Sequence, residues 1–298
     1  MSAAEVARDH SAARRRLALA VAGEAGRLWA LVDPARIGES WLGLLARLLV
    51  LLAGAQSAAA GRADGYLDEV LDAQGVAASA AGRVSAQALS GVASDGRDLG
   101  DLLYQPAIST LVGIKRGATV DQALAAGGAG LDMIVRTQVA DAGRAADQVA
   151  LVARPQATGY VRMLVGKSCS RCAILAGRTY RWNAGFDRHP RCDCVHIPAR
   201  EDSADDLRTD PKRYFASLPA AEQDRLFTRA GAAAIRAGAD IGQVVNARRG
   251  MYEASGRQFT TVGARKKRPR LMPEQILREA RGDRGEALRL LRLHGYLR

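Results

Sequence analysis

All four cysteines of this 298-residue chain lie within one stretch of 26 residues, from Cys169 to Cys194. Histidines are interleaved with them in the spacing C-x2-C-x16-H-x2-C-x-C-x-H. The module around this stretch, roughly residues 159–198, is turn-rich and has few large apolar side chains. Because a module of this size buries little apolar surface, it usually needs a metal ion or disulfides to hold it together.

The spacing favours a zinc site. Two cysteines separated by two residues can turn both sulfur atoms toward one ion, and Zn²⁺ accepts thiolates and imidazoles in a tetrahedron. In an extended segment every second side chain lies on the same face, and the proline after His189 favours a bend that lets this histidine join Cys192. The first choice of ligands is Cys169, Cys172 and Cys192 with either His189 or Cys194. Six candidates compete for the four places: Cys169, Cys172, His189, Cys192, Cys194 and His196.

The predicted role of the metal is structural. A hydrolytic zinc site keeps one position open and has a glutamate or aspartate nearby as general base. The only acids close to the cluster are Asp187 and Asp193, and neither H-E-x-x-H nor H-x-E occurs in the chain. A pair of structural disulfides, or a cysteine pocket without metal, is the alternative. His10 and His294, outside the cluster, are expected to be solvated or packing residues, and no catalytic residue is predicted.

Residues 1–154 are predicted to be almost entirely helical. Aromatic residues are only 5% of the chain and alanine is abundant, which favours packed helices over a β-sandwich. Helices are expected over 40–74, with a stop at Gly75, over 77–92, and over 119–149, where the glycines at 127, 128 and 130 weaken the pattern. The basic run before Leu17 superficially resembles a signal peptide, but the helical pattern continues beyond its short apolar core, which favours an ordinary helix.

The most apolar stretch runs from Trp41 to Ala60 and contains Arg47. A membrane-spanning helix needs about 20 apolar residues, and a central arginine costs roughly 2.5–3.5 kcal/mol. Only eight uninterrupted apolar residues follow Arg47. We therefore expect a soluble protein without a membrane span, in which this stretch is a core helix buried on most of its faces.

Beyond residue 154 the pattern changes from long helices to short elements. A strand is expected at 160–165, a strand or a short helical turn within 173–182, and an extended segment at 188–196. Helices are expected at 219–238 and 240–251. Two further helices, at 273–281 and 285–293, should form a hairpin with Pro273 at the first helical position.

The chain is strongly basic. Its formal net charge of +12 should attract it to nucleic acid, acidic lipid or an acidic protein surface. Seven of these twelve excess charges lie in residues 263–298. The segment GARKKRPR at 263–270 is either a solvated linker or a nucleic-acid contact. The candidate contact residues are Arg265, Lys266, Lys267, Arg268 and Arg270.

The cluster resembles the motif of MuF-like phage head morphogenesis proteins. That motif is a C-x2-C knuckle, a short Leu/Ala-Gly stretch, and then His-Pro-x-Cys-x-Cys with a nearby proline. The matching positions here are Cys169, Cys172, Leu175, Gly177, His189, Pro190, Cys192, Cys194 and Pro198. The block GADIGQVVNARRG, from Gly238 to Gly250, and the preceding Pro211, Tyr214 and Phe215 are similar to the same family in phages of actinobacteria. The likeness covers roughly residues 155–298, and His196 is not a fixed part of the motif.

The resemblance implies a minor virion protein that associates with the portal protein and the capsid interior and acts in head assembly or DNA delivery, beside packaged DNA. It would be located in the host cytoplasm during assembly and afterwards in the capsid interior near the portal. The expected fold is mainly α with a small α+β module. It comprises a helical region at 1–154, a zinc-ribbon-like MuF-type domain at 155–262, and a basic linker with a helical hairpin at 263–298. Two alternatives stand beside it: an enzyme, either a capsid maturation protease or a metal-dependent nuclease, and a stand-alone nucleic-acid-binding zinc protein.

Overall fold

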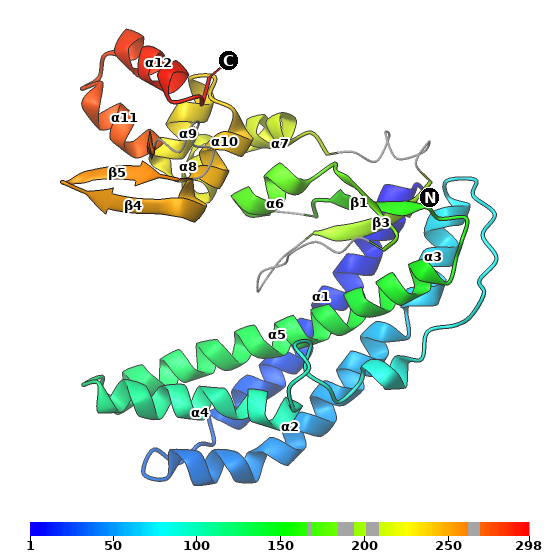
Figure 1. The fold of residues 1–298 in the computed structure, drawn as a ribbon. Helices are drawn as coiled ribbons and strands as arrows, with labels where there is room; N and C mark the ends of the chain where they lie inside the picture. Colours follow the sequence, from blue (N-terminus) through cyan, green and yellow to red (C-terminus); the bar gives the residue numbers. More distant parts are fainter. Residues whose placement is uncertain (166–167, 184–193, 201–208, 262–268, 298) are drawn as a thin grey trace. The chain divides into compact units, whose positions relative to one another are not determined.

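The computed structural model describes residues 1–165, 168–183, 194–200, 209–261 and 269–297. Helices predominate in these ranges, and short strands form two three-stranded sheets (Figure 1). The prediction of a mainly helical chain with little sheet is therefore confirmed. The chain divides into two compact units, which we call the helical unit (Met1–Val161 with Thr179–Leu207) and the C-terminal unit (Arg162–Arg178 with Arg208–Arg298). The three-part division at residues 154 and 262 stays a prediction.

Long helices build the helical unit. α1 (Ala3–Trp29) and α5 (Val120–Val152) both begin with a capping box, in which Ser2 and Thr119 accept the N–H three residues later. The side chains of Glu5 and Gln122 complete the two boxes by accepting the N–H of the cap residue. α5 contacts all the other long helices of the unit. These are α1, α2 (Ile37–Ala60), α3 (Ala63–Asp72) and α4 (Leu99–Lys115), and a 3₁₀ turn lies at Ala86–Leu89.

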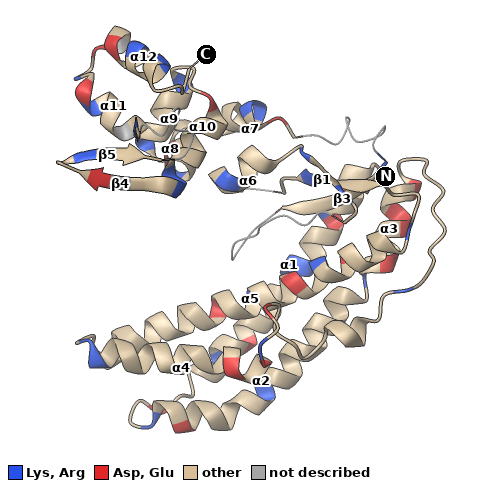
Figure 2. Cartoon of the chain, in the orientation of Figure 1, with Lys and Arg blue, Asp and Glu red and all other residues tan. Residues whose placement is uncertain are grey.

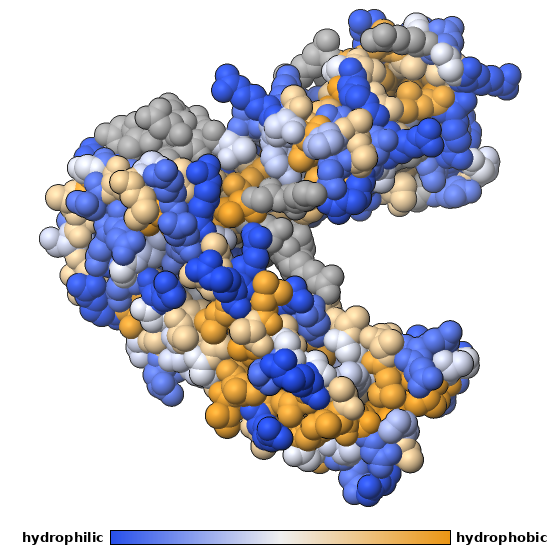
Figure 3. Space-filling view, turned by 180° about the vertical axis from the view of Figure 1, so that it is seen from behind, coloured by the Kyte–Doolittle hydropathy of each residue, from blue (hydrophilic) through white to orange (hydrophobic). Residues whose placement is uncertain are grey.

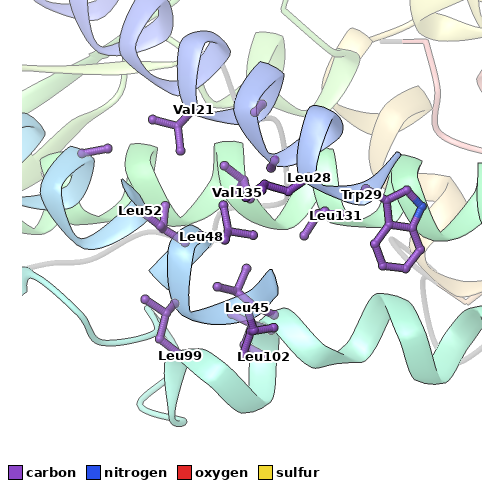
Figure 4. Close-up of a cluster of buried hydrophobic side chains, with 14 of the residues drawn as sticks. Val21, Leu28, Trp29, Leu45, Leu48, Leu52, Leu99, Leu102, Leu131 and Val135 are labelled. Carbon is purple, nitrogen blue, oxygen red and sulfur yellow. The ribbon is translucent and has the colours of Figure 1, made fainter. Parts of the chain in front are cut away.

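The core of the helical unit is a layer of leucine, valine, alanine and tryptophan side chains between α1, α2, α4 and α5 (Figure 4). Leu52 is fully buried there, and burial of one such side chain contributes about 1.5–3 kcal/mol. The two tryptophans meet edge to face, with ring centroids 4.9 Å apart. Their indole N–H groups are satisfied, because Trp29 donates to the carbonyl of Leu124 and Trp41 to that of Leu103, each at 2.9 Å.

The predicted helix at 77–92 is wrong. Residues 76–98 are irregular apart from the turn Ala86–Leu89 and an isolated antiparallel bridge between Val92 and Asp98. This segment is rich in alanine, serine and glycine and has no apolar stripe, so packing against a core would not stabilise a helix there. α4, which contains Pro106, lies in the region predicted to be helical, but no separate bounds were predicted for it. The predicted helix at 40–74 is two helices, α2 and α3, and the stop at Gly75 is confirmed by its positive φ of 68°.

The glycines of α5 do not interrupt it, because they make room for a tryptophan. A Cβ atom at Gly127 would overlap the hydroxyl of Thr110 and come within 2.7 Å of the Trp29 ring, and one at Gly128 would come within 3.0 Å of that ring. The helix continues unbroken through both positions. Glycine is used here because a large side chain packs directly against the helix backbone.

A small sheet follows the long helices. β1 (Gly159–Met163) overlaps the predicted strand at 160–165, beginning one residue earlier. It pairs antiparallel with β2 (Thr179–Arg181), with Tyr160 opposite Tyr180. The sheet order is β2-β1-β3, with β3 at Val195–Ala199. α6 (Ser170–Leu175) lies between β1 and β2 in the chain, so the predicted segment 173–182 contains the end of a helix and a strand.

The C-terminal unit contains short helices and a second antiparallel sheet. The predicted helix at 219–238 is divided at Thr228, whereas the terminal helical hairpin with Pro273 at the first turn is confirmed. Besides α6, the helices described in this unit are α7 (Pro211–Ser217), α8 (Ala220–Phe227), α9 (Arg229–Arg236), α10 (Ile241–Ala247), η3 (Arg248–Gly250), α11 (Pro273–Glu279) and α12 (Arg284–Leu293). The sheet, which the sequence did not predict, has the order β4 (Met251–Ala254), β5 (Arg257–Thr260), β6 (Arg270–Leu271). Tyr296 is fully buried beside it and donates its hydroxyl proton to the carbonyl of Leu271.

The substitution Gly127→Ala should destabilise the protein by roughly 1–3 kcal/mol, because the added methyl group displaces Trp29 and Thr110. Gly130→Ala is the matched control, since a Cβ atom there meets nothing within 4 Å. The control should stabilise the protein by up to about 1 kcal/mol, because alanine is the better helix former. Chemical denaturation measures both effects, and equal free energies of unfolding for the two variants would contradict this account of the packing.

Candidate functional site

The first two cysteines of the predicted metal site lie together. Cys169 is the N-cap of α6, and its sulfur atom accepts the backbone N–H of Cys172 at 3.4 Å. The sulfur of Cys172 is buried and accepts a hydrogen bond from Nη2 of Arg162 at 3.5 Å. An N–H donor on one sulfur and a guanidinium on the other favour thiolates, which are the form that binds zinc.

The other two described candidates lie at β3. Cys194 precedes the strand and His196 is within it, and both side chains are buried. The ring of His196 stacks on Tyr160 with centroids 4.4 Å apart. Two hydrogen bonds fix the strand against α3 and the turn that follows it. The hydroxyl of Tyr66 donates to the carbonyl of His196, and the amide of Gln74 donates to that of Pro198 at 2.7 Å.

The described residues do not test the predicted metal site. Cys169 and Cys172 belong to the C-terminal unit, and Cys194 and His196 belong to the helical unit. His189 and Cys192 lie outside the described residues. No group of three or more histidine, cysteine, aspartate or glutamate side chains suited to a metal ion occurs within the described ranges. The zinc site and its ligand set therefore stay predictions.

A buried polar cluster, which the sequence did not predict, lies where α1, α3 and α5 meet. Asp147 of α5 accepts a hydrogen bond from Nη1 of Arg14 at 2.8 Å and is 3.0 Å from Nε2 of His10. The His10 ring stacks on Tyr66 with centroids 4.0 Å apart and an interplanar angle of 4°. His10 is thus a packing residue, one of the two roles expected for it, and it connects α1 to the residue that holds β3.

The charges of this cluster are strongly coupled. Burial by itself raises the pKa of the Asp147 carboxyl, but the charges of Arg14 and His10 and their hydrogen bonds outweigh burial and hold this pKa well below its ordinary value. Burial raises the pKa of the Tyr66 hydroxyl well above its ordinary value. Arg14 and His10 are one helical turn apart, so their spacing places them on one face of α1. Nothing in the sequence indicates Asp147 as their partner.

Of the predicted nucleic-acid contact residues, only Arg270 lies within the described residues. Arg265, Lys266, Lys267 and Arg268 lie outside the described residues. Arg270, in β6, is 6% exposed. Its Nη1 donates to the side chain of Gln243 at 2.8 Å, and its guanidinium carbon lies 3.9 Å from the ring centroid of Tyr296. Arg270 therefore takes part in the packing of the C-terminal unit, and a role of this segment in binding nucleic acid stays a prediction.

One side of α2 is apolar and exposed, so the prediction of a helix buried on most faces is wrong. Leu42, Val50 and Leu51 are 61%, 74% and 42% exposed, and the neighbouring Ala46 and the charged Arg47 are also exposed on this side. We call the four apolar residues Leu42, Ala46, Val50 and Leu51 the apolar face of α2. Glu39 and Arg47 are the only charged residues of the helix (Figure 2). Seen from behind, hydrophobic residues gather on the lower part of the helical unit (Figure 3).

Two further observations bear on this surface. α4, which packs against α2, carries three exposed apolar residues of its own, Ile108, Leu111 and Val112. Among the described residues, Ile37–Asp72 is the one stretch with the length and apolar composition of a membrane span. Core helices of soluble proteins also have this length and composition, so one such stretch does not by itself identify a membrane span.

The model of the VG15 protein family matches residues 1–221. The chain belongs to the VG15 family. VG15 proteins are phage proteins, so the predicted phage origin is confirmed. The more specific prediction, a head morphogenesis protein of the MuF type, stays a prediction. The matched residues of this VG15-family chain include α1 to α7 and all described metal candidates. The block Gly238–Gly250 lies beyond them. No curated protein and no solved structure gives a significant match.

Asp147→Asn should destabilise this VG15-family protein by roughly 3–5 kcal/mol, because it leaves the buried Arg14 without its counter-charge. Asp132→Asn is the matched control. It lies on the same helix and removes the ion pair with Arg136, one helical turn away, but that pair is partly exposed, so the expected loss is below about 0.5 kcal/mol. Guanidinium denaturation measures both losses, and a loss below 1 kcal/mol for Asp147→Asn would contradict the assigned role.

The same carboxylate predicts an acid-sensitive fold. Because the folded-state pKa of Asp147 is depressed, its contribution is fully present above the ordinary carboxyl range and is lost as the pH falls through that range. The wild type should therefore lose stability between about pH 5 and about pH 2 more steeply than Asp147→Asn does. Thermal unfolding at a series of pH values tests this, and parallel curves for the two proteins would exclude it.

Proposed function

We propose that this chain is a minor component of the phage head that docks on the portal through its helical unit and acts in head assembly or DNA delivery. Membership of a phage protein family supports a role in a phage particle. The exposed apolar face of α2 is the observation that carries the docking role. The protein would be made in the host cytoplasm and then be located in the capsid interior near the portal, beside packaged DNA.

The apolar face of α2 has the properties of a protein interface. Contiguous exposed apolar surface on a water-soluble protein is typical of interaction sites. Burial of Leu42, Val50 and Leu51 on a partner would contribute roughly 1–2 kcal/mol each, given how much of each side chain is exposed. Gly43 and Gly54 also lie on α2, and a Cβ atom at either would meet nothing within 4 Å. Such small residues allow a second helix to approach the α2 backbone closely, as expected for an amphipathic helix docking on a helical partner.

The docking role predicts that Leu42→Asp and Val50→Asp abolish incorporation of the chain into heads. The matched control is Val149→Asp, which introduces the same charge at an apolar residue of α5 that is 47% exposed. All three proteins should unfold within about 0.5 kcal/mol of the wild type, because the changes are on the surface. Immunoblots of purified heads then measure incorporation. Normal incorporation of both α2 variants, or absence of the wild type from heads, would overturn the proposal.

A structural zinc ion is the second part of the proposal. Cys169 and Cys172 would supply two thiolates, and the remaining ligands would come from His189, Cys192, Cys194 and His196. The adjacent sulfur atoms and their N–H and guanidinium donors support a metal-binding pair. When bound, the ion would cross-link segments that are too short to be stable by apolar burial alone.

The zinc proposal predicts about one zinc per chain in protein purified without added metal. The double variant Cys169→Ser, Cys172→Ser should contain none, whereas Ser170→Ala, between the two cysteines, should keep the metal. Elemental analysis per chain is the measurement. A wild-type protein without zinc would contradict this part of the proposal and leave the docking role intact. The enzymatic alternative and the stand-alone nucleic-acid-binding alternative stay predictions from the sequence.

A further inference from the structure

The excess positive charge of the chain belongs to one of its two units. Lysines and arginines outnumber acidic residues by 15 in the C-terminal unit, whereas acidic residues are in excess by 3 in the helical unit. Most acids of the C-terminal unit already have a structural role within it. Four form ion pairs with arginines and three are N-caps of helices: Glu222, Asp224, Glu279 and Glu286, and Asp210, Asp240 and Asp283. A unit of this charge attracts polyanions.

α9 and α10 are joined in the manner of a helix-turn-helix. Four residues, 237–240, connect them, and the second of these, Gly238, has a positive φ of 95°. The two helices pack closely at Gly231, where an added Cβ atom would come within 3.3 Å of Val244. Buried apolar residues continue from α9 through the turn into α10: Ala232, Ala234, Ala239, Ile241, Val244 and Ala247. In DNA-binding proteins, two helices joined by such a short glycine-containing turn place the second helix in the major groove.

The side of α10 opposite its buried residues carries hydrogen-bonding side chains that the fold does not use. Gly242, Asn246 and Arg249 follow one another at intervals of four and three residues, so they lie along one side of α10 and η3. Arg249 is exposed and Asn246 is half-buried. Neither side chain has a hydrogen bond or an ion pair within the part of the chain that the structure describes. The glycine at the start of this line allows a wall of a groove to approach the helix backbone closely.

Arg248 places a further cation beside this side of the helix. Its guanidinium donates to the carbonyl of Phe227 at 3.0 Å, so η3 is held next to the residues at which α9 begins. Arg229, the first residue of α9, is exposed there. Arg229 and Arg249 therefore lie on neighbouring elements, and both are available to an external anion.

The segment 263–270, which the sequence predicts as a nucleic-acid contact, is attached next to the same elements. The N–H of Thr261, just before the segment, donates to the carbonyl of Gly250 in η3 at 3.2 Å. Arg270, its last residue, donates to the side chain of Gln243 in α10 at 2.8 Å. The segment therefore begins and ends beside α10 and η3.

We propose that α10 and η3 lie in the major groove of duplex DNA, with Asn246 and Arg249 against base edges and Arg229 against a phosphate. The major groove, about 12 Å wide, admits one α-helix. An arginine fork pairs with O6 and N7 of guanine, and an asparagine amide pairs with N6 and N7 of adenine. The inference is independent of the portal-docking proposal, because it concerns the C-terminal unit and its test needs only the purified chain and DNA.

Fluorescence anisotropy of the full-length chain with a short labelled DNA duplex of mixed sequence tests this interface. Arg249→Gln should weaken binding by about ten-fold, and Arg229→Gln should reduce the slope of log affinity against log salt by about one. Arg292→Gln is the matched control, because it removes the same charge from the same unit at an exposed arginine of α12. Binding by this control should change less than about two-fold, since its charge is outside the proposed interface. Thermal unfolding of each variant confirms that it is folded.

A second duplex of the same sequence, with 7-deazapurines in place of adenine and guanine, separates groove binding from attraction to phosphates. It lacks the N7 acceptors of the major groove but keeps every phosphate. The wild type should bind this duplex several-fold more weakly than the unmodified one. The double variant Asn246→Ala, Arg249→Gln should bind both duplexes equally, because it has lost the side chains that contact N7.

Three results would overturn the proposal: no saturable binding of duplex DNA by the wild type, equal affinity of the wild type for the two duplexes, or a loss in Arg292→Gln as large as that in Arg249→Gln. The last two would show attraction to the phosphate backbone by general surface charge only. Binding of single-stranded DNA or of duplex RNA as tightly as of duplex DNA would also exclude the proposal, because neither presents a major groove that a helix can enter.

Discussion

The ion pair between Asp147 and Arg14 is the interaction on which the helical unit depends. Asp147 is 3% exposed, and a carboxylate so deeply buried is tolerated only when paired and hydrogen-bonded. Its two partners lie on α1, and one of them, His10, stacks on Tyr66 of α3. Tyr66 in turn donates to the carbonyl of His196 in β3. One buried charge therefore fixes three helices and the strand that carries His196, with Cys194 directly before it.

The two units present surfaces of opposite character. The apolar face of α2 is costly to leave in water and would be stabilised by a protein partner. Docking of the apolar face of α2 on a protein of the phage head is the proposed role of this surface. The C-terminal unit instead carries the excess positive charge of the chain, because most of its acidic residues are held in ion pairs and N-caps and are outnumbered by its lysines and arginines.

The sequence correctly predicted elements that depend on local signals, and its predictions were wrong where packing between elements decides the structure. The strand at β1, the stop at Gly75 and the hairpin that begins at Pro273 follow from side-chain alternation, a positive φ and a fixed proline φ. The helix at 77–92 failed because propensity without an apolar stripe does not sustain a helix. The predicted helix at 119–149 is confirmed by α5, where the packing of Trp29 against the backbone explains why glycines of low helix propensity occur.

By itself, the sequence determined the phage setting, the mainly helical fold and the closeness of Cys169 to Cys172, which one short turn of chain enforces. Only the tertiary structure showed that α2 keeps an apolar face exposed, that Arg270 packs inside the C-terminal unit, and that Asp147 is the partner of Arg14. The physical reason is sequence distance. Periodicity and capping act over a few residues, whereas the pairing of two buried charges 133 residues apart is decided only when the helices that carry them pack.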